Sequence, residues 1–132
     1  MTSDSNNIPS ILIVDDEPNI RDALSRWFTL RGFRVEQAED GLEAVEICEL
    51  KHFDAITMDV EMPRMNGLDA IPLIKKDHPD TAILVLTGFA KNIHKAQELG
   101  ANIVMTKPVR LRELEQEVRK LLPKDKNSIP EH

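Results

Sequence analysis

Five polar side chains that could share one chemical site each follow a short apolar run of the sequence. They belong to Asp15, Asp16, Asp59, Thr87 and Lys107. Three carboxylates brought together repel one another by about 4 kcal/mol per pair at ~4 Å and an effective dielectric constant of roughly 20. Shared protons with raised pKa values, or a bound cation, would relieve that repulsion. We favour Mg²⁺, because it prefers hard oxygen ligands and also accepts phosphate oxygens.

The apolar runs that precede these residues are predicted to be β-strands. Four of them, at residues 11–14, 55–58, 82–86 and 103–105, lack strict alternation and are partly β-branched, as expected of strands covered on both faces. A fifth segment, 34–38, alternates polar and apolar residues and is typical of an edge strand.

Segments with helical spacing of apolar residues lie between these strands. We expect the first helix to bury one stripe of residues: Ile20, Ala23, Leu24, Trp27 and Phe28. Further helices are expected at about 41–50, from about Gly67 to before Pro79, before Gly100, and from Leu111 to before Pro123. Strands that alternate with helices of this length favour βαβ units around a parallel sheet. Because ligands bind beyond the carboxyl ends of such strands, the five polar side chains are expected to meet in one cleft.

Composition limits the classes of function that the chain can have. Its 132 residues fit one domain, and a 41% hydrophobic, 30% charged composition is typical of a globular protein. A net charge of −6 without a visible basic face argues against direct binding to nucleic acid. The absence of an apolar stretch of about 20 residues or a signal-peptide pattern predicts no membrane segment and a cytoplasmic location. We assign residues 10–122 to the domain, 1–9 to a disordered N-terminal tail, and 123–132 to a C-terminal tail or linker stub.

Taken together, these motifs resemble the receiver domain of two-component response regulators. The resemblance covers roughly residues 10–122. It depends on four motifs, which are Asp15-Asp16, Met58-Asp59-Val60-Glu61-Met62-Pro63-Arg64-Met65-Asn66-Gly67, Leu86-Thr87-Gly88 and Lys107-Pro108. It implies a three-layer α/β fold of the flavodoxin-like type, with a five-stranded parallel sheet in the order 2-1-3-4-5 flanked by five helices.

The same resemblance implies how phosphate and metal would be bound. Asp59 would accept a phosphoryl group from a sensor histidine kinase or a phosphotransfer protein. Asp16 and Asp59 would bind Mg²⁺ directly with the backbone carbonyl of Glu61, and Asp15 would act mainly through water.

Two further side chains would respond to the phosphoryl group. Lys107 would pair with Asp59 at rest and hold a phosphoryl oxygen afterwards, while Thr87 would swing to bind another. The Lys107-Pro108 bond is a candidate for a cis peptide that aims the lysine inward. The chain would then be a signalling module that acts on an unidentified downstream protein, and not an enzyme.

The chain departs from the receiver pattern at several positions. Val104 stands where receivers commonly carry an aromatic residue, so the usual coupling between that ring and the threonine is in doubt. The segment 87–100 is about two residues shorter than the family pattern, which predicts a fourth helix that is short, shifted or partly disordered. Pro72 is expected to kink the third helix or to loosen its first turn. Glu61 and Phe89 occupy positions that tune hydrolysis of the acyl phosphate in the family.

Other interpretations of the same residues remain open. Asp15-Asp16 alone is compatible with ordinary helix capping. A pseudo-receiver that binds partners without phosphorylation would share the fold. A Mg²⁺-dependent phosphohydrolase of the haloacid-dehalogenase type would place a second Asp two residues after its nucleophile, and Asp15-Asp16-Glu17 lacks that spacing. The charged residues of the last helix are expected to form a solvated face: Arg110, Arg112, Glu113, Glu115, Glu117, Arg119 and Lys120.

Overall fold

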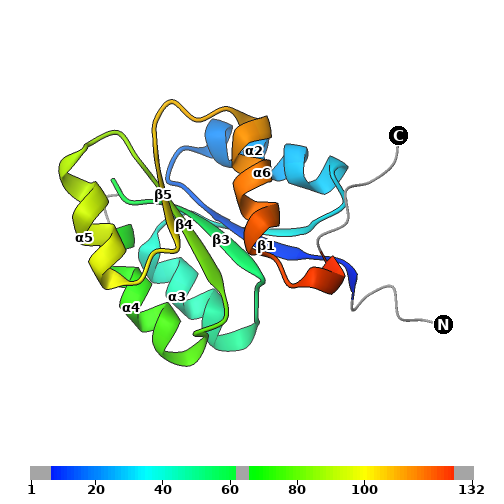
Figure 1. Ribbon diagram of the computed structural model, residues 1–132, viewed down its shortest axis with the longest axis horizontal. Coiled ribbons are helices and arrows are strands. Elements are labelled where there is room, and N and C mark those ends of the chain that lie inside the picture. Colours follow the sequence, from blue (N-terminus) through cyan, green and yellow to red (C-terminus); the bar gives the residue numbers. More distant parts are fainter. Residues whose placement is uncertain (1–6, 62–65, 127–132) are drawn as a thin grey trace.

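A parallel five-stranded sheet forms the centre of the molecule (Figure 1). The computed structural model describes residues 7–61 and 66–126. The strands are β1 (Ser10–Val14), β2 (Arg34–Ala38), β3 (Ala55–Asp59), β4 (Ala82–Thr87) and β5 (Ile103–Thr106). They are hydrogen-bonded in the order β2-β1-β3-β4-β5, and every neighbouring pair is parallel. The predicted order 2-1-3-4-5 is therefore confirmed.

Within the described residues, five helices cover the two faces of this sheet (Figure 1). They are α2 (Pro18–Leu30), α3 (Gly41–Leu50), α4 (Gly67–Asp77), α5 (Lys91–Leu99) and α6 (Leu111–Leu121). The helices α2 and α6 pack on one face, and α3, α4 and α5 pack on the other. This arrangement gives the three-layer, flavodoxin-like α/β fold that the sequence predicts.

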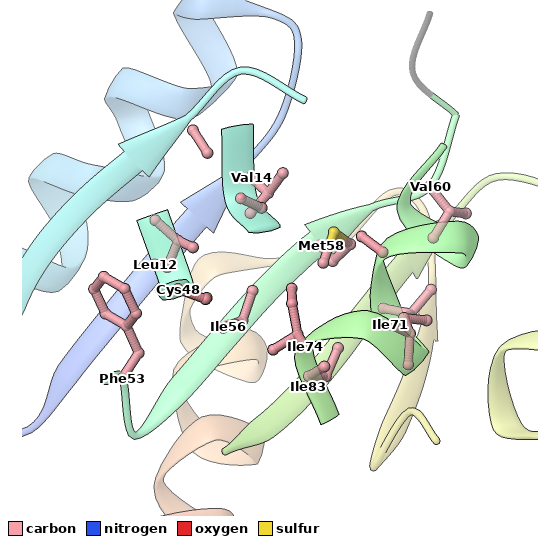
Figure 2. Close-up of a cluster of buried hydrophobic side chains, with 14 of the residues drawn as sticks. Leu12, Val14, Cys48, Phe53, Ile56, Met58, Val60, Ile71, Ile74 and Ile83 are labelled. Carbon is pink, nitrogen blue, oxygen red and sulfur yellow. The ribbon is translucent and has the colours of Figure 1, made fainter. Parts of the chain in front are cut away.

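Each face of the sheet carries its own apolar cluster, because successive side chains of a strand point to opposite faces. The cluster under α3 and α4 includes Leu12, Ile56, Met58 and Ile83, all fully buried (Figure 2). Burial of each such side chain stabilises the fold by about 1.5–3 kcal/mol. The sheet is therefore a rigid support for residues that project from its carboxyl edge.

The buried face of α2 is narrower than the sequence predicts. Leu24 and Phe28 are buried, but Trp27 is only partly buried, Ala23 is exposed, and Ile20 is 40% exposed. The prediction was wrong for Ile20 and Ala23. These two side chains lie on the flank of the helix toward the start of α6 and not on the flank that contacts the sheet.

The charged face of α6 also differs from the prediction at two positions. Glu115 and Arg119 are each only 5% exposed. The Glu115 carboxylate accepts hydrogen bonds from Arg119 Nε at 2.8 Å, Arg31 Nε at 3.0 Å and Trp27 Nε1 at 3.0 Å. The Arg119 guanidinium also lies 4.9 Å from the centre of the Phe33 ring. The two charges are buried because this side of α6 packs against the end of α2.

Two of the predicted departures from the receiver pattern concern helices α4 and α5. Helix α4 runs through the exposed Pro72 without interruption, and its N-cap Asn66 accepts a hydrogen bond from Leu68 N at 2.7 Å. Helix α5 has nine residues, and its C-cap is Gly100, whose φ of 117° is left-handed. The short fourth helix that the sequence predicts is therefore present.

The described residues include parts of both segments that we assigned to tails. The Pro9 carbonyl accepts a hydrogen bond from Arg34 N at 2.8 Å. A 3₁₀ helix, η1, spans Lys124–Lys126, and Lys126 Nζ lies 3.1 Å from Asp54 Oδ2. Residues 1–6 and 127–132, like residues 62–65 of the motif around Asp59, lie outside the described residues, and the domain limits at 10 and 122 stay predictions. None of the helices in the described part of the chain has the length and apolar character needed to cross a bilayer.

Candidate functional site

Four strands deliver polar side chains to one edge of the sheet. Asp15 follows β1, Asp59 ends β3, Thr87 ends β4 and Lys107 follows β5. The register places Asp59 beside Leu86, the residue before Thr87. Asp15 and Asp59 are each 2% exposed, and Thr87 is fully buried. Residues more than ninety positions apart in the sequence therefore line one small site.

The acidic part of this site consists of Asp15, Asp16 and Asp59. Each offers a carboxylate oxygen, and these oxygens all lie within 4.8 Å of one another. Burial raises the pKa of Asp15, and repulsion by Asp59 raises it further. Burial also raises the pKa of Asp59, against the opposing effect of Lys107. Three hard oxygen donors at this separation, two of them buried, fit the needs of a divalent cation such as Mg²⁺.

Backbone contacts fix the two buried carboxylates in place. Asp15 Oδ1 accepts a hydrogen bond from Glu17 N at 2.9 Å, and the Asp15 carbonyl accepts one from Arg21 Nη1 at 2.7 Å. Asp59 Oδ1 accepts a hydrogen bond from Glu61 N at 3.0 Å. Both side chains are thus held by the loop that follows their own strand.

The basic side of the site is Lys107. Its Nζ lies 3.0 Å from Asp59 Oδ1 and 3.7 Å from Glu61 Oε1. Burial alone would lower the pKa of Lys107, but its hydrogen bond with Asp59 and the surrounding negative charge outweigh this effect and raise the pKa. The lysine is therefore a cation that faces Asp59. The Lys107–Pro108 peptide bond is cis, as predicted.

The Glu61 side chain is also part of the site, together with a residue that the sequence analysis missed. Glu61 Oε2 accepts hydrogen bonds from Thr87 Oγ1 at 2.6 Å and from Asn92 Nδ2 at 2.9 Å, and Glu61 Oε1 accepts one from Gly88 N at 3.2 Å. Partial burial would raise the pKa of Glu61, but these hydrogen bonds and Lys107 lower it overall. Asn92 gave no signal in the sequence, because its role depends on where the first turn of α5 lies.

Comparisons with known proteins identify the family of this chain. The family model for the response regulator receiver domain matches residues 11–119. The chain belongs to this family. Response regulator MprA of Mycobacterium ulcerans (strain Agy99) is 37% identical to this receiver domain over 118 residues, which are 88% of this chain and 51% of the relative. The receiver domain thus spans about half the length of the curated relatives it matches.

Solved structures resemble this receiver domain over nearly their whole length. Chemotaxis protein CheY4 of Vibrio cholerae has a TM-score of 0.81 and 29% identity, covering 87% of this chain and 99% of its own. Response regulator TrrA of Thermotoga maritima, solved in complex with Mg²⁺-BeF, has a TM-score of 0.80 and 33% identity, covering 87% of this chain and all of its own. Both likenesses agree with a signalling domain of two-component systems.

Two departures from the receiver pattern can now be placed in space. Val104 lies in β5, is partly buried, and packs against the apolar cluster on the α4 side of the sheet. Phe89 is 54% exposed, and its backbone N–H donates to Thr87 Oγ1 at 3.1 Å. The bulky ring at position 89 therefore comes two residues after the buried threonine of the site.

Proposed function

We propose that this receiver domain accepts a phosphoryl group on Asp59 in a Mg²⁺-dependent reaction and signals by a change of conformation. One observation supports the proposal most strongly: the buried Asp59 carboxylate lies between a cation, with Lys107 Nζ at 3.0 Å, and an acidic pair, with carboxylate oxygens of Asp15 and Asp16 within 4.8 Å. A phosphoryl group on Asp59 would then have the positive charge of Lys107 on one side. On the other side it would have the carboxylates that could share a divalent cation with it.

The chemistry assigned to Asp59 is nucleophilic attack on phosphorus. One carboxylate oxygen of Asp59 forms a bond to phosphorus as the phosphohistidine N–P bond breaks, and the electron pair stays on the imidazole nitrogen. Lys107, whose Nζ lies 3.0 Å from Asp59 Oδ1, and the Gly88 N–H would stabilise charge on the transferring oxygens. Mg²⁺ held by Asp16, Asp59 and the Glu61 backbone carbonyl, with Asp15 acting through water, would neutralise the remaining charge.

The partners follow from this chemistry. A sensor histidine kinase or a phosphotransfer protein supplies the phosphoryl group, and an unidentified protein receives the signal. The domain itself catalyses only its own phosphorylation from small donors and its own dephosphorylation. We place the reaction in the cytoplasm, since a single buried Cys48 fits a reducing compartment.

A phosphorylation assay with matched variants tests the proposal. We expect a saturable adduct when the protein is incubated with Mg²⁺ and acetyl phosphate, seen as the mass of one added phosphoryl group. Asp59→Asn should abolish the adduct, whereas Asp69→Asn, at an exposed position in the first turn of α4, should retain it. An adduct that survives Asp59→Asn, or none in the wild type, would refute the proposal.

A second candidate is a pseudo-receiver that binds partners without phosphorylation. It is favoured by the Glu61 carboxylate, which already accepts hydrogen bonds from Thr87 and Gly88. The same assay separates the two functions, because a pseudo-receiver would show no adduct and no affinity for Mg²⁺. Steady turnover of phosphate esters would instead favour a phosphohydrolase.

A further inference from the structure

The Glu61 carboxylate lies among four donors that converge on one spot. Thr87 Oγ1 donates to it at 2.6 Å, Asn92 Nδ2 at 2.9 Å and Gly88 N at 3.2 Å, and Lys107 Nζ lies 3.7 Å away. Asn92 Nδ2 also donates to Thr87 Oγ1 at 3.1 Å. The network joins the residues after β3, the end of β4 and the first turn of α5.

Three of these donors are the groups that the proposed phosphorylation would use. A phosphoryl group on Asp59 would need Thr87, Gly88 and Lys107 for its oxygens. The Glu61 carboxylate already accepts hydrogen bonds from Thr87 and Gly88, and it lies 3.7 Å from Lys107 Nζ. A glutamate side chain is ordinarily ionised at neutral pH, so Glu61 would compete with the phosphoryl group as one anion with another. Both anions cannot keep the same hydrogen bonds.

The fourth donor, Asn92, connects this competition to helix α5, most of whose described residues are exposed or only partly buried. Among the described residues of α5, only Ala96 is buried, and the N-cap Ala90 makes no side-chain capping hydrogen bond. The backbone N–H groups of Asn92 and Ile93 bond only within the same turn, to Phe89 O at 3.0 Å and Ala90 O at 3.1 Å. Two side-chain hydrogen bonds of Asn92, to Glu61 and to Thr87, connect the first turn of α5 to the site.

We propose that Glu61 is an internal stand-in for the phosphoryl group, and that phosphorylation displaces it and so releases the first turn of α5 through Asn92. The inference rests on the proposed function of Asp59. It also gives the domain a switch that does not require an aromatic ring at position 104, where Val104 has none to rotate. Glu61 and Asn92 are positioning residues in this scheme, since the bond to phosphorus forms at Asp59.

Hydrogen exchange of the backbone amides of α5 tests the inference. Without ligand, Glu61→Ala and Asn92→Ala should each speed hydrogen exchange in the first turn of α5 several-fold. The double variant should exchange no faster than either single variant. Mg²⁺ with beryllofluoride should produce the same acceleration of exchange in the wild type. In Glu61→Ala, where exchange is already fast, it should add little further acceleration. Because no internal anion must be displaced, Glu61→Ala should also bind beryllofluoride several-fold more tightly.

A matched control separates a local effect from a general loss of charge. Glu98 is an exposed carboxylate at the other end of α5 that pairs with His94, so Glu98→Ala should leave exchange in the first turn at the wild-type rate. Wild-type rates in ligand-free Glu61→Ala would overturn the inference, as would an Asp59-dependent adduct that leaves α5 unchanged. Complete failure of the wild type to bind beryllofluoride at Asp59 would instead refute the proposed function, and the inference with it.

Discussion

Gly67 packs so closely against Asp59 that a Cβ atom at position 67 would lie 2.7 Å from the Asp59 carbonyl oxygen. The same Cβ would lie 2.8 Å from the side chain of Met58. Helix α4 therefore begins in direct contact with the end of β3, and a glycine is required there because of space and not because of a left-handed backbone. This contact fixes the start of α4 relative to the proposed phosphoacceptor.

Gly67→Ala should destabilise the fold by about 1–3 kcal/mol, the usual cost of forcing an extra methyl group into a packed interior. Urea denaturation of the wild type and the variant measures this difference. Gly88→Ala is the matched control, because nothing lies within 4 Å of a Cβ at that position. The free energy of unfolding of Gly88→Ala should stay near the wild-type value, and equal losses in both variants would contradict this account of Gly67.

Thr57 carries a buried hydroxyl that makes no hydrogen bond within the described residues. The residue is 1% exposed in the middle of β3. Since an unpaired buried hydroxyl costs free energy, Thr57→Val should raise the free energy of unfolding by about 1 kcal/mol. Thermal and urea denaturation both report that change.

Thr81 provides the opposite case for the same substitution. It is also 1% exposed, but its Oγ1 donates to the Phe53 carbonyl at 2.7 Å. Thr81→Val leaves that acceptor unpaired, so it should lower the free energy of unfolding by about 1–3 kcal/mol. A stabilising effect at both positions would show that hydroxyl pairing does not decide the outcome.

The strand order was predicted from the resemblance to receiver domains, whereas the location of the site could be predicted from the sequence for one geometric reason. Parallel strands end at the same edge, so residues that follow buried runs, such as Asp15, Asp59 and Lys107, are brought together by the sheet itself. Neither the direction of an individual side chain nor the packing of helices was needed for that prediction.

Features that depend on helix packing could not be predicted in this way. The carboxylate of Glu61 bonds to Asn92 because the first turn of α5 lies beside β4, and no spacing in the sequence encodes that position. Glu115 and Arg119 flank the apolar stripe of α6, where a charged residue is buried or exposed according to the neighbouring helix. Ile20 was predicted to be buried because its spacing is helical, but spacing does not say how wide the covered face is.

Glu115 should make the stability of the domain sensitive to acid. Burial alone would raise its pKa, but hydrogen bonds from Arg119 and Arg31 lower the pKa below its ordinary value of 4.5. A group whose pKa is lowered on folding contributes stability that is complete above the unfolded pKa. That contribution is lost as the pH falls below 4.5 and through the lowered pKa of the folded state.

Glu115→Gln tests this pH dependence. The variant should be less stable than the wild type by about 1–3 kcal/mol at neutral pH, because a charged acceptor of three hydrogen bonds is removed. The difference should shrink as the pH is lowered from about 7 to about 3, since the wild type then loses the same charge. Urea denaturation across this range measures it, and a difference that stays constant with pH would contradict the assignment.

We expect the Phe89 side chain to influence how long a phosphoryl group on Asp59 would survive. Its backbone N–H donates to Thr87 Oγ1 at 3.1 Å, and its ring lies 5.7 Å from Lys91 Nζ. The side chain is 54% exposed, so its removal should cost little folding free energy. Because Phe89 comes two residues after Thr87, we expect its apolar ring to hinder the approach of water to a phosphoryl group on Asp59.

Phe89→Ala should therefore shorten the lifetime of the phosphoryl group on Asp59 several-fold, measured as loss of the adduct after the phosphodonor is removed. Phe89→Leu keeps much of the apolar bulk and should give a lifetime between those of the wild type and Phe89→Ala. Because Phe89 donates to Thr87 through its backbone, neither substitution removes that hydrogen bond, so the series isolates the effect of the ring. An unchanged lifetime in Phe89→Ala would exclude screening by the ring and leave hydrolysis to the groups around Asp59, with Glu61 the first to test by substitution.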